Sequence, residues 1–259
     1  MSLARADLES LLRARRLDRT LTRVDPSTGS GLAGRDPVHD AAATGAPALD
    51  ARLGGGFPRG QLSEIVGPRS SGRTSLILQM LAAATARGEL VALVDALDML
   101  DVESAAAAGV DLGRLLWIRG HVVVNPGMCR DMNQRALEQA VRAAALVLQA
   151  GNFGLVVFDV AEAPADAIRR LPFTTWMRVQ RMVDGSPTAC VLAGAQPMAR
   201  SSAGLTLDVG VRDVGPCGRG IRFSPRLFEG LDIDARVVQA RHRSQQQLDV
   251  RVPLSTAAS

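Results

Sequence analysis

A stretch rich in glycine and serine, GPRSSGRTS at residues 67–75, has the spacing of a phosphate-binding loop. Gly67, Gly72 and Thr74 match the pattern G-x-x-x-x-G-K-[ST], but Arg73 stands at the lysine position. An apolar strand is expected just before the loop and a helix just after it. In that setting the loop's backbone N–H groups and the helix N-terminus form a cradle for phosphate.

A magnesium ion bound beside such a phosphate needs oxygen ligands from the protein. The hydroxyl of Thr74 is the first candidate, and Asp159 is the second because it ends another apolar stretch, GLVVFD. Finding both halves on one chain predicts descent from a nucleotide-binding fold.

Arg73 has two explanations that the sequence leaves open. The chain contains no lysine, so all 30 of its basic residues are arginine, and drift in composition explains the change by itself. The guanidinium group is also wider and planar, so it fits the position of a compact ammonium badly. Nucleotide binding can then survive while turnover is lost, because catalysis needs stabilisation of the transition state in particular. Arg69 adds positive charge within the loop.

Composition limits the class of protein. The 259 residues, of which 47% are hydrophobic, suit one generous α/β domain with extensions. The three cysteines and three histidines lie far apart and predict no metal site. A formal charge of +4 and a pI near 10.0 are compatible with nearby nucleic acid. No apolar run is long enough to cross a membrane, and the charged N-terminus does not resemble a secretory signal, so we expect a cytoplasmic protein.

Three regions differ in character along the chain. Residues 1–24 predict an amphipathic helix, and residues 25–48 predict a flexible linker rich in Gly, Pro, Ser and Ala. Residues 49–259 predict a core in which apolar strands alternate with helices, which is typical of a mostly parallel sheet covered on both faces. The expected strands are residues 62–66, 90–95, 115–120, 154–159 and 188–195, and the expected helices are residues 74–88, 101–109, 130–150 and 173–183.

The last quarter of the chain changes to short alternating segments separated by turn residues. Four of them, GLTLDVGVRD, GIRFSP, ARVVQARHR and QLDVRVPL, predict antiparallel strands appended to the parallel sheet.

Residues 49–116 resemble the core of the RecA recombinases. The matching motifs are LD…LGGG.PRG, E.VGP.SSG.TSL, VDA…LD and GVD…LL, and the resemblance continues more weakly through LVVFD to the final hairpin. It implies that Gln196 corresponds to the family's phosphate-sensing glutamine. The residues implied for the nucleotide site are therefore Gly67, Ser70, Ser71, Gly72, Arg73, Thr74, Ser75, Asp159 and Gln196.

The resemblance also implies that key parts of the ATPase site are missing. Leu97 stands where the family has its catalytic glutamate, and a leucine cannot polarise an attacking water. Ser104 stands where a tyrosine packs on adenine, and the family's paired lysines fall at Gln239 and Arg241. Drift away from lysine explains neither the leucine nor the serine. We therefore expect a pseudo-ATPase without catalytic residues, which leaves open whether ATP and Mg²⁺ bind without hydrolysis.

The regions that contact DNA in recombinases are shortened here. Only residues 196–204 remain of one loop, where Arg200 is the candidate phosphate contact. Residues 169–183 replace the other DNA-binding loop. Phe173 and Trp176 lie beside arginines, which suits stacking on bases. Their spacing also suits a helix packed on the sheet, and we favour this second interpretation. Weak or absent DNA binding is expected, as is the lack of a C-terminal domain for duplex DNA.

The short chain and the degraded site most resemble the ImuA family of damage-inducible accessory proteins. That resemblance implies translesion synthesis in SOS mutagenesis, through contacts with the inactive polymerase homologue ImuB and an error-prone C-family DNA polymerase, and it leaves open RecA as a further partner. One alternative is an active RecA-like, DNA-dependent ATPase, a recombinase paralogue. The other is a cell-division inhibitor similar to SulA.

The N-terminal helix matches in position the arm by which recombinase subunits join. We expect it to dock on a neighbour, either another copy of this chain, RecA or a partner in mutagenesis; the alternative is a helix folded back on its own core. The residues expected at this interface are Leu8, Leu11, Leu12, Arg15 and Leu17.

Overall fold

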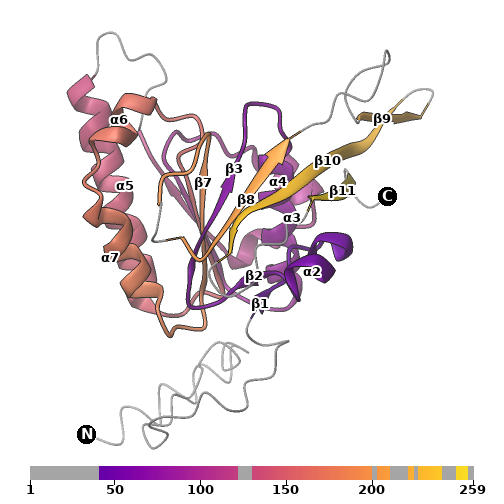
Figure 1. Ribbon diagram of the computed structural model, residues 1–259, viewed down its shortest axis with the longest axis horizontal. Coiled ribbons are helices and arrows are strands. Elements are labelled where there is room, and N and C mark those ends of the chain that lie inside the picture. The colour runs from indigo at the N-terminus through magenta and orange to yellow at the C-terminus, as the bar shows by residue number, and fades with distance from the viewer. Residues whose placement is uncertain are drawn as a thin grey trace, which may run out of the picture.

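The computed structural model describes residues 41–121, 130–199, 203–210, 221–224, 227–240 and 249–255. These residues form an α/β fold with a large central sheet (Figure 1). In chain order the elements are β1 (Ala41–Ala42), α2 (Pro47–Leu53), β2 (Phe57–Pro58), β3 (Leu62–Val66), α3 (Arg73–Ala86), β4 (Val91–Asp95), α4 (Val102–Ala107), the 3-10 helix η2 (Leu112–Arg114), β5 (Leu115–Arg119), α5 (Arg130–Ala150), β6 (Leu155–Asp159), α6 (Ala165–Arg170), α7 (Thr174–Val183), β7 (Ala189–Gly194), β8 (Leu205–Gly210), β9 (Ile221–Ser224), β10 (Leu227–Ala240) and β11 (Asp249–Ser255).

The sheet has the strand order β11-β10-β8-β3-β7-β6-β4-β5, and β9 pairs with β10 off this path. All neighbours from β8 to β5 are parallel, whereas β10 pairs antiparallel with β8, β9 and β11. The central strands β3, β4 and β7 are buried at every residue, as expected for parallel strands covered on both faces. The predicted fold class, a mostly parallel sheet flanked by helices, is therefore confirmed.

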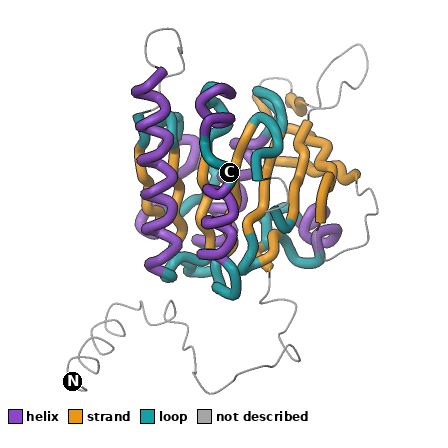
Figure 2. The backbone as a smooth tube through the Cα atoms, turned by 60° about the vertical axis from the view of Figure 1, so that its left-hand side comes forward, coloured by secondary structure: helices purple, strands orange, loops and turns teal. Residues whose placement is uncertain are grey.

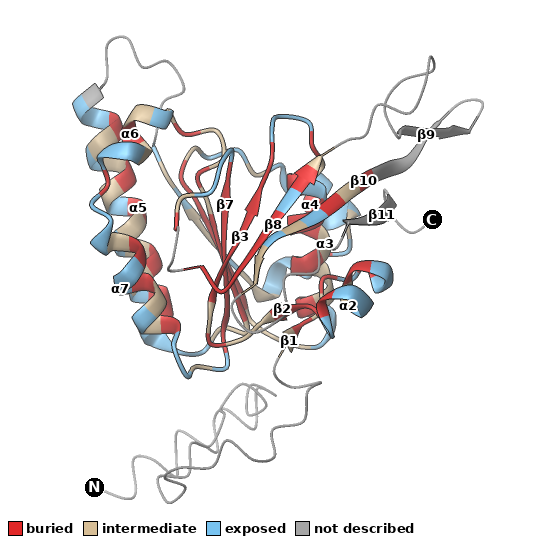
Figure 3. Cartoon of the chain, in the orientation of Figure 1, coloured by how far each residue is buried: buried red, intermediate tan, exposed pale blue. Residues whose placement is uncertain are grey.

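Helices cover the two faces of the sheet separately (Figures 1 and 2). On one face α2, α3 and α4 pack on a cluster that includes Leu49, Ile65, Leu76 and Phe57. On the other face α5, α6 and α7 pack on a second cluster, which includes Trp176. Figure 3 shows the buried residues of these helices turned toward the sheet. Within the described residues, no helix is long and apolar enough to cross a membrane.

The connection from β7 to β8 has no helix in its described residues, 195–199 and 203–204. Residues 195–204 run from the carboxyl end of β7 to the amino end of β8, although parallel crossovers usually need at least about a dozen residues. Irregular backbone over a buried strand needs hydrogen-bond partners. Glu64, in the middle of β3, supplies them: its Oε1 accepts 2.7 Å bonds from the N–H groups of Met198 and Ala199, and its Oε2 accepts from the Thr206 hydroxyl at 3.1 Å. The fully buried carboxylate thus anchors the crossover.

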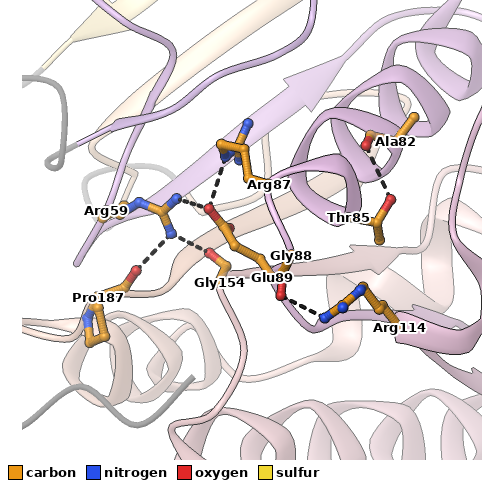
Figure 4. A network of polar contacts seen from close by, with 9 residues as sticks. All are labelled: Arg59, Ala82, Thr85, Arg87, Gly88, Glu89, Arg114, Gly154 and Pro187. Atoms are coloured by element: carbon orange, nitrogen blue, oxygen red, sulfur yellow. Dashed lines mark hydrogen bonds and ion pairs between the residues drawn. The ribbon is translucent and has the colours of Figure 1, made fainter. Parts of the chain in front are cut away.

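A second polar network joins elements at the amino ends of the strands (Figure 4). Arg59 donates to the carbonyl oxygens of Gly154 at 2.8 Å and Pro187 at 2.9 Å, and to Oε1 of Glu89 at 2.8 Å. Arg87 donates to the same Glu89 oxygen at 2.9 Å. Arg59 therefore connects the lead-in to β3 with the turns that precede β4, β6 and β7.

Cys190 lies in the middle of this sheet, on β7. The thiol is buried, and burial raises its pKa to about 12 because the charged thiolate is disfavoured away from water.

The structure differs from the sequence prediction in one boundary, one strand pairing and one additional helix. Residues 41–48 were assigned to the linker, but they contain β1 and the start of α2, where Pro47 suits the first helical turn. The segment 204–213 was expected to be antiparallel, yet β8 pairs parallel with β3 and antiparallel with β10. Helix α6 was not predicted, because it is short. The N-terminal helix at residues 1–24 and the linker up to residue 40 lie outside the described residues.

Candidate functional site

The phosphate-binding loop connects the end of β3 to the start of α3. Gly67 is buried where a Cβ atom would lie 2.1 Å from the carbonyl oxygen of Val209, so no larger residue fits against β8. Ser70 adopts a left-handed conformation with a φ of 58°, and Gly72, at 89°, caps α3. Glycine reaches that conformation without strain. The local geometry is that of a tight strand-to-helix turn at the N-terminus of a long helix.

Three hydroxyl groups of the loop differ in exposure. Ser71 is 2% exposed, and its Oγ has no hydrogen-bond partner among the described residues. Thr74 and Ser75 are exposed at the first turn of α3. An orphaned buried hydroxyl is unusual in a folded protein and is expected where a ligand or a water completes the site. The loop therefore fits an anion, which its backbone, Ser71 and Thr74 would hold.

Arg73 is turned across the edge of the sheet. Its guanidinium donates to the carbonyl oxygen of Gly194 at 2.7 Å and to Oε1 of Glu162 at 3.0 Å. The other carboxylate oxygen of Glu162 accepts from Nε of Arg69. The Arg73 side chain is 7% exposed and the Arg69 side chain 73% exposed, so one arginine is anchored and the other lies in solvent.

Asp95 and Asp159 end the neighbouring strands β4 and β6, directly opposite each other. Burial, above all, raises the pKa of Asp159 to about 6; Asp95 and Glu162 add to the shift, while the Ala161 N–H group and Arg73 oppose it. Asp95 is engaged differently: its Oδ2 accepts from the Leu100 N–H at 2.8 Å and from the Trp117 ring nitrogen at 3.3 Å. Asp159 therefore takes up a proton at a higher pH than an ordinary aspartate does.

The position expected for a catalytic base is held by Leu97, which packs partly buried against the α5–α7 cluster. The next residue, Asp98, has a φ of 59° and is bound on both carboxylate oxygens by Arg119, each at 2.7 Å. This hydrogen bonding lowers the pKa of Asp98. The Arg119 guanidinium also stacks 4.8 Å from the centre of the Trp117 ring. The Asp98 carboxylate is thus bound to β5 through Arg119.

The remaining positions of the predicted site are spread around it. Ser104 is exposed on α4, where its N–H and hydroxyl groups donate to Asp101, the N-cap residue. Gln196 is exposed just beyond β7. Gln239 lies on β10 and donates to the carbonyl oxygen of Ala203 at 3.3 Å. The other predicted contacts lie outside the described residues; these are Leu8, Leu11, Leu12, Arg15, Leu17, Arg200 and Arg241.

Helix α7 packs one face on the sheet and exposes another face to solvent. Trp176, at 4% exposure, and Val179 and Val183 are buried against the sheet, and the Trp176 ring lies 6.3 Å from that of Phe158. Phe173 and Met177 remain 41% and 38% exposed. The structure thus supports the packing interpretation for Trp176 and leaves Phe173 on the outside.

Sequence reasoning missed two acidic residues of this region. Glu162 follows Asp159 by three residues beyond the strand end, and only its contact with Arg69 and Arg73 marks it. Glu64 was a point of resemblance without an assigned role, and a charged residue inside an apolar strand was the available signal. Within the described part of the chain, no group of three or more His, Cys, Asp or Glu side chains is placed to hold a metal ion.

The family model of the RecA N-terminal domain matches residues 17–167, more than half of the chain. RecA of Salinispora tropica is 38% identical over 157 residues, which cover 58% of this chain and 41% of that protein. RecA of Frankia casuarinae is 36% identical over 162 residues, 60% of this chain and 43% of that protein. RecA of Acholeplasma laidlawii is 35% identical over 153 residues, 57% and 42% respectively. The chain therefore spans only about two-fifths of the curated relatives it matches.

A solved structure supports the fold. The crystal structure of the RadB recombinase superimposes with a TM-score of 0.56 at 19% identity, covering 80% of this chain and 93% of RadB. At that identity the likeness concerns the arrangement of helices and strands. Together with the match of the family model, it leads to one conclusion: the chain belongs to the RecA N-terminal domain family.

Proposed function

We propose that this chain is a non-catalytic, RecA-like accessory protein of damage-induced translesion DNA synthesis. It acts through contacts with ImuB and with an error-prone C-family DNA polymerase, which the resemblance to the ImuA family implies, and RecA is the further partner to test. The observation that carries the non-catalytic part is Arg73. The cation of the phosphate-binding loop is bound by Glu162 and the Gly194 carbonyl of the same chain. Leu97 and Ser104 also support the proposal, because they stand where the resemblance to RecA implies a catalytic glutamate and a tyrosine that packs on adenine.

A phosphate-release assay tests the absence of catalysis. The chain is incubated with MgATP, with and without single-stranded DNA, and compared with Asp159→Ala. The proposal predicts no release above the level of that variant. Turnover that depends on DNA and disappears in Asp159→Ala would instead establish an active ATPase.

The active alternative is favoured by two specific observations. The raised pKa of Asp159 and the orphaned hydroxyl of Ser71 keep part of a working site intact. Perturbed carboxylates cluster at functional sites, although structural ones exist as well. These features suit binding of an anion and a cation, but they supply no group that activates water.

The proposed partners call for a separate test. Pull-downs with ImuB, the polymerase and RecA are compared between the full chain and a variant lacking residues 1–24. We expect the deletion to lose at least one partner, because Leu8, Leu11 and Leu12 recur at helical spacing on an amphipathic segment. Unchanged capture of all three would remove the N-terminal helix from the interface.

A further inference from the structure

Glu162 binds the two arginines that lie in the phosphate-binding loop. Its Oε1 lies 3.0 Å from Arg73, and its Oε2 contacts Nε of Arg69. Both oxygens are thus used, and each guanidinium binds its own oxygen. Phosphate oxygens bind arginine with the same charge-assisted geometry. The Glu162 carboxylate therefore occupies the two guanidinium groups to which a phosphate in the loop would bind.

The three side chains differ in how firmly they are held. Arg73 is nearly buried and is also held by the Gly194 carbonyl, and a buried guanidinium without an anionic partner would cost stability. Glu162 is 23% exposed and belongs to the short connection between β6 and α6, so its side chain can turn toward water. Arg69 is largely exposed, and its ion pair adds little stability by itself.

The loop retains binding capacity beyond these arginines. The Oγ of Ser71 is buried and has no hydrogen-bond partner in the described part of the chain, and the N-terminus of the long helix α3 favours an anion. A phosphate that replaced Glu162 would gain these groups in addition to both arginines. A carboxylate with two oxygens contacts only the arginines.

We propose that Glu162 is an internal competitor of phosphate: a polyphosphate binds the loop only when it displaces this carboxylate from Arg69 and Arg73. The inference deepens the proposed function, since it explains how a loop that retains its shape stays closed to nucleotide. It also gives the site a defined second state, in which the carboxylate is free and the loop holds a phosphate.

Titration calorimetry with inorganic pyrophosphate and with MgATP tests this competition. Glu162→Gln keeps the size of the side chain and removes its charge, so we expect it to bind both ligands about 10- to 100-fold more tightly than the natural chain. Adding Arg69→Ala should remove much of that gain. Asp184→Asn, which removes an exposed carboxylate at the C-terminal end of α7, is the matched control and should bind like the natural chain. Should Glu162→Gln fail to fold, Glu162→Asp, which shortens the side chain, should bind severalfold more tightly.

The outcomes separate this inference from the proposed function. Equal affinities of the natural chain and Glu162→Gln, within twofold, would overturn the competition. Tighter binding of MgATP but not of pyrophosphate would overturn it as well, because the competition acts on the phosphate groups. Hydrolysis of ATP by Glu162→Gln would overturn the non-catalytic proposal and leave the competition standing.

Discussion

The guanidinium group of Arg73 donates a 2.7 Å hydrogen bond to the carbonyl oxygen of Gly194, which ties the first residue of α3 to the last residue of β7. The same group reaches Glu162. Its planar fork makes both contacts at once, whereas an ammonium offers a single nitrogen on a flexible stem. In this chain the residue at the lysine position joins two elements of the fold.

Restoring the lysine should therefore cost stability without restoring turnover. We expect Arg73→Lys to lower the free energy of unfolding by about 1–3 kcal/mol, because a buried contact to Gly194 or Glu162 is lost. ATP hydrolysis should stay at background, since Leu97 provides no base. Urea denaturation and a phosphate-release assay measure the two effects. Arg87→Lys, at a more exposed arginine, serves as the control; a stable, active Arg73→Lys would contradict this account.

The carboxyl group of Asp159 should make stability depend on pH. Its pKa is about 6 in the folded chain and about 3.8 ordinarily, so the folded state binds the proton more tightly. As pH rises from about 4 to 6, the free energy of unfolding decreases, because the buried Asp159 carboxyl group must lose its proton in the folded chain. Above that range this loss of stability stays constant. Asp159→Asn should thus be more stable by up to about 2–3 kcal/mol at pH 7.5 and equal to the natural chain near pH 4. Urea denaturation across this pH range measures the difference.

The same pH series with Asp184→Asn gives the baseline for removing an exposed carboxylate, which should change little at any pH. If the stability of Asp159→Asn relative to the natural chain increased as the pH was lowered, the folded chain would instead stabilise the charged form of Asp159.

Replacing Glu64 should loosen the crossover between β7 and β8. Glu64→Leu leaves the N–H groups of Met198 and Ala199 unsatisfied, which should cost at least about 3 kcal/mol. Glu64→Gln retains an acceptor and should cost about 1–2 kcal/mol less. Chemical denaturation gives the free energies, and amide exchange at residues 198 and 199 should accelerate most.

Thr206→Val is the matched control, because it removes only the weaker contact to Glu64, and it should cost about 1 kcal/mol. Unchanged exchange at these two amides in Glu64→Leu would show that the crossover is held by packing alone.

Arg59 should contribute more stability than its partly exposed neighbour Arg87. Arg59→Ala leaves the carbonyl groups of Gly154 and Pro187 without this donor and removes a charged partner of Glu89. We expect a loss of about 2–4 kcal/mol in thermal or urea denaturation. Arg87→Ala should cost less than about 1 kcal/mol. Equal losses in the two variants would contradict the central role of Arg59.

Much of this architecture follows from local patterns in the sequence. Continuous apolar runs such as residues 62–66 become buried parallel strands, and the glycine loop falls between a strand and a helix. Helix α5 covers the predicted residues 130–150 because its apolar positions recur with the helical period. Strand partners are less accessible: alternation identifies β8 as a strand but does not say that it pairs with both β3 and β10.

The candidate site was predicted in part. The spacing of residues predicts the phosphate-binding loop and Asp159. The resemblance to RecA implies that Leu97 stands at the position of the catalytic glutamate. The role of Glu162 could not be predicted, because it depends on how a short connection brings a carboxylate to arginines about 90 residues away in sequence. Glu64 shows the same limit, since its partners lie beyond residue 197.

Because Cys190 is buried, the rate at which its thiol is labelled can measure how often the central strands open. The Cys190 thiol, buried near the amino end of β7 and with a pKa of about 12, reacts with a maleimide only after β7 has separated from its neighbours. In a variant with Cys129→Ser and Cys217→Ser, the labelling rate would therefore report opening of the central strands. Polyphosphate, partner proteins and DNA can each be added to that reaction, and slower labelling would identify the ligands that hold the sheet closed.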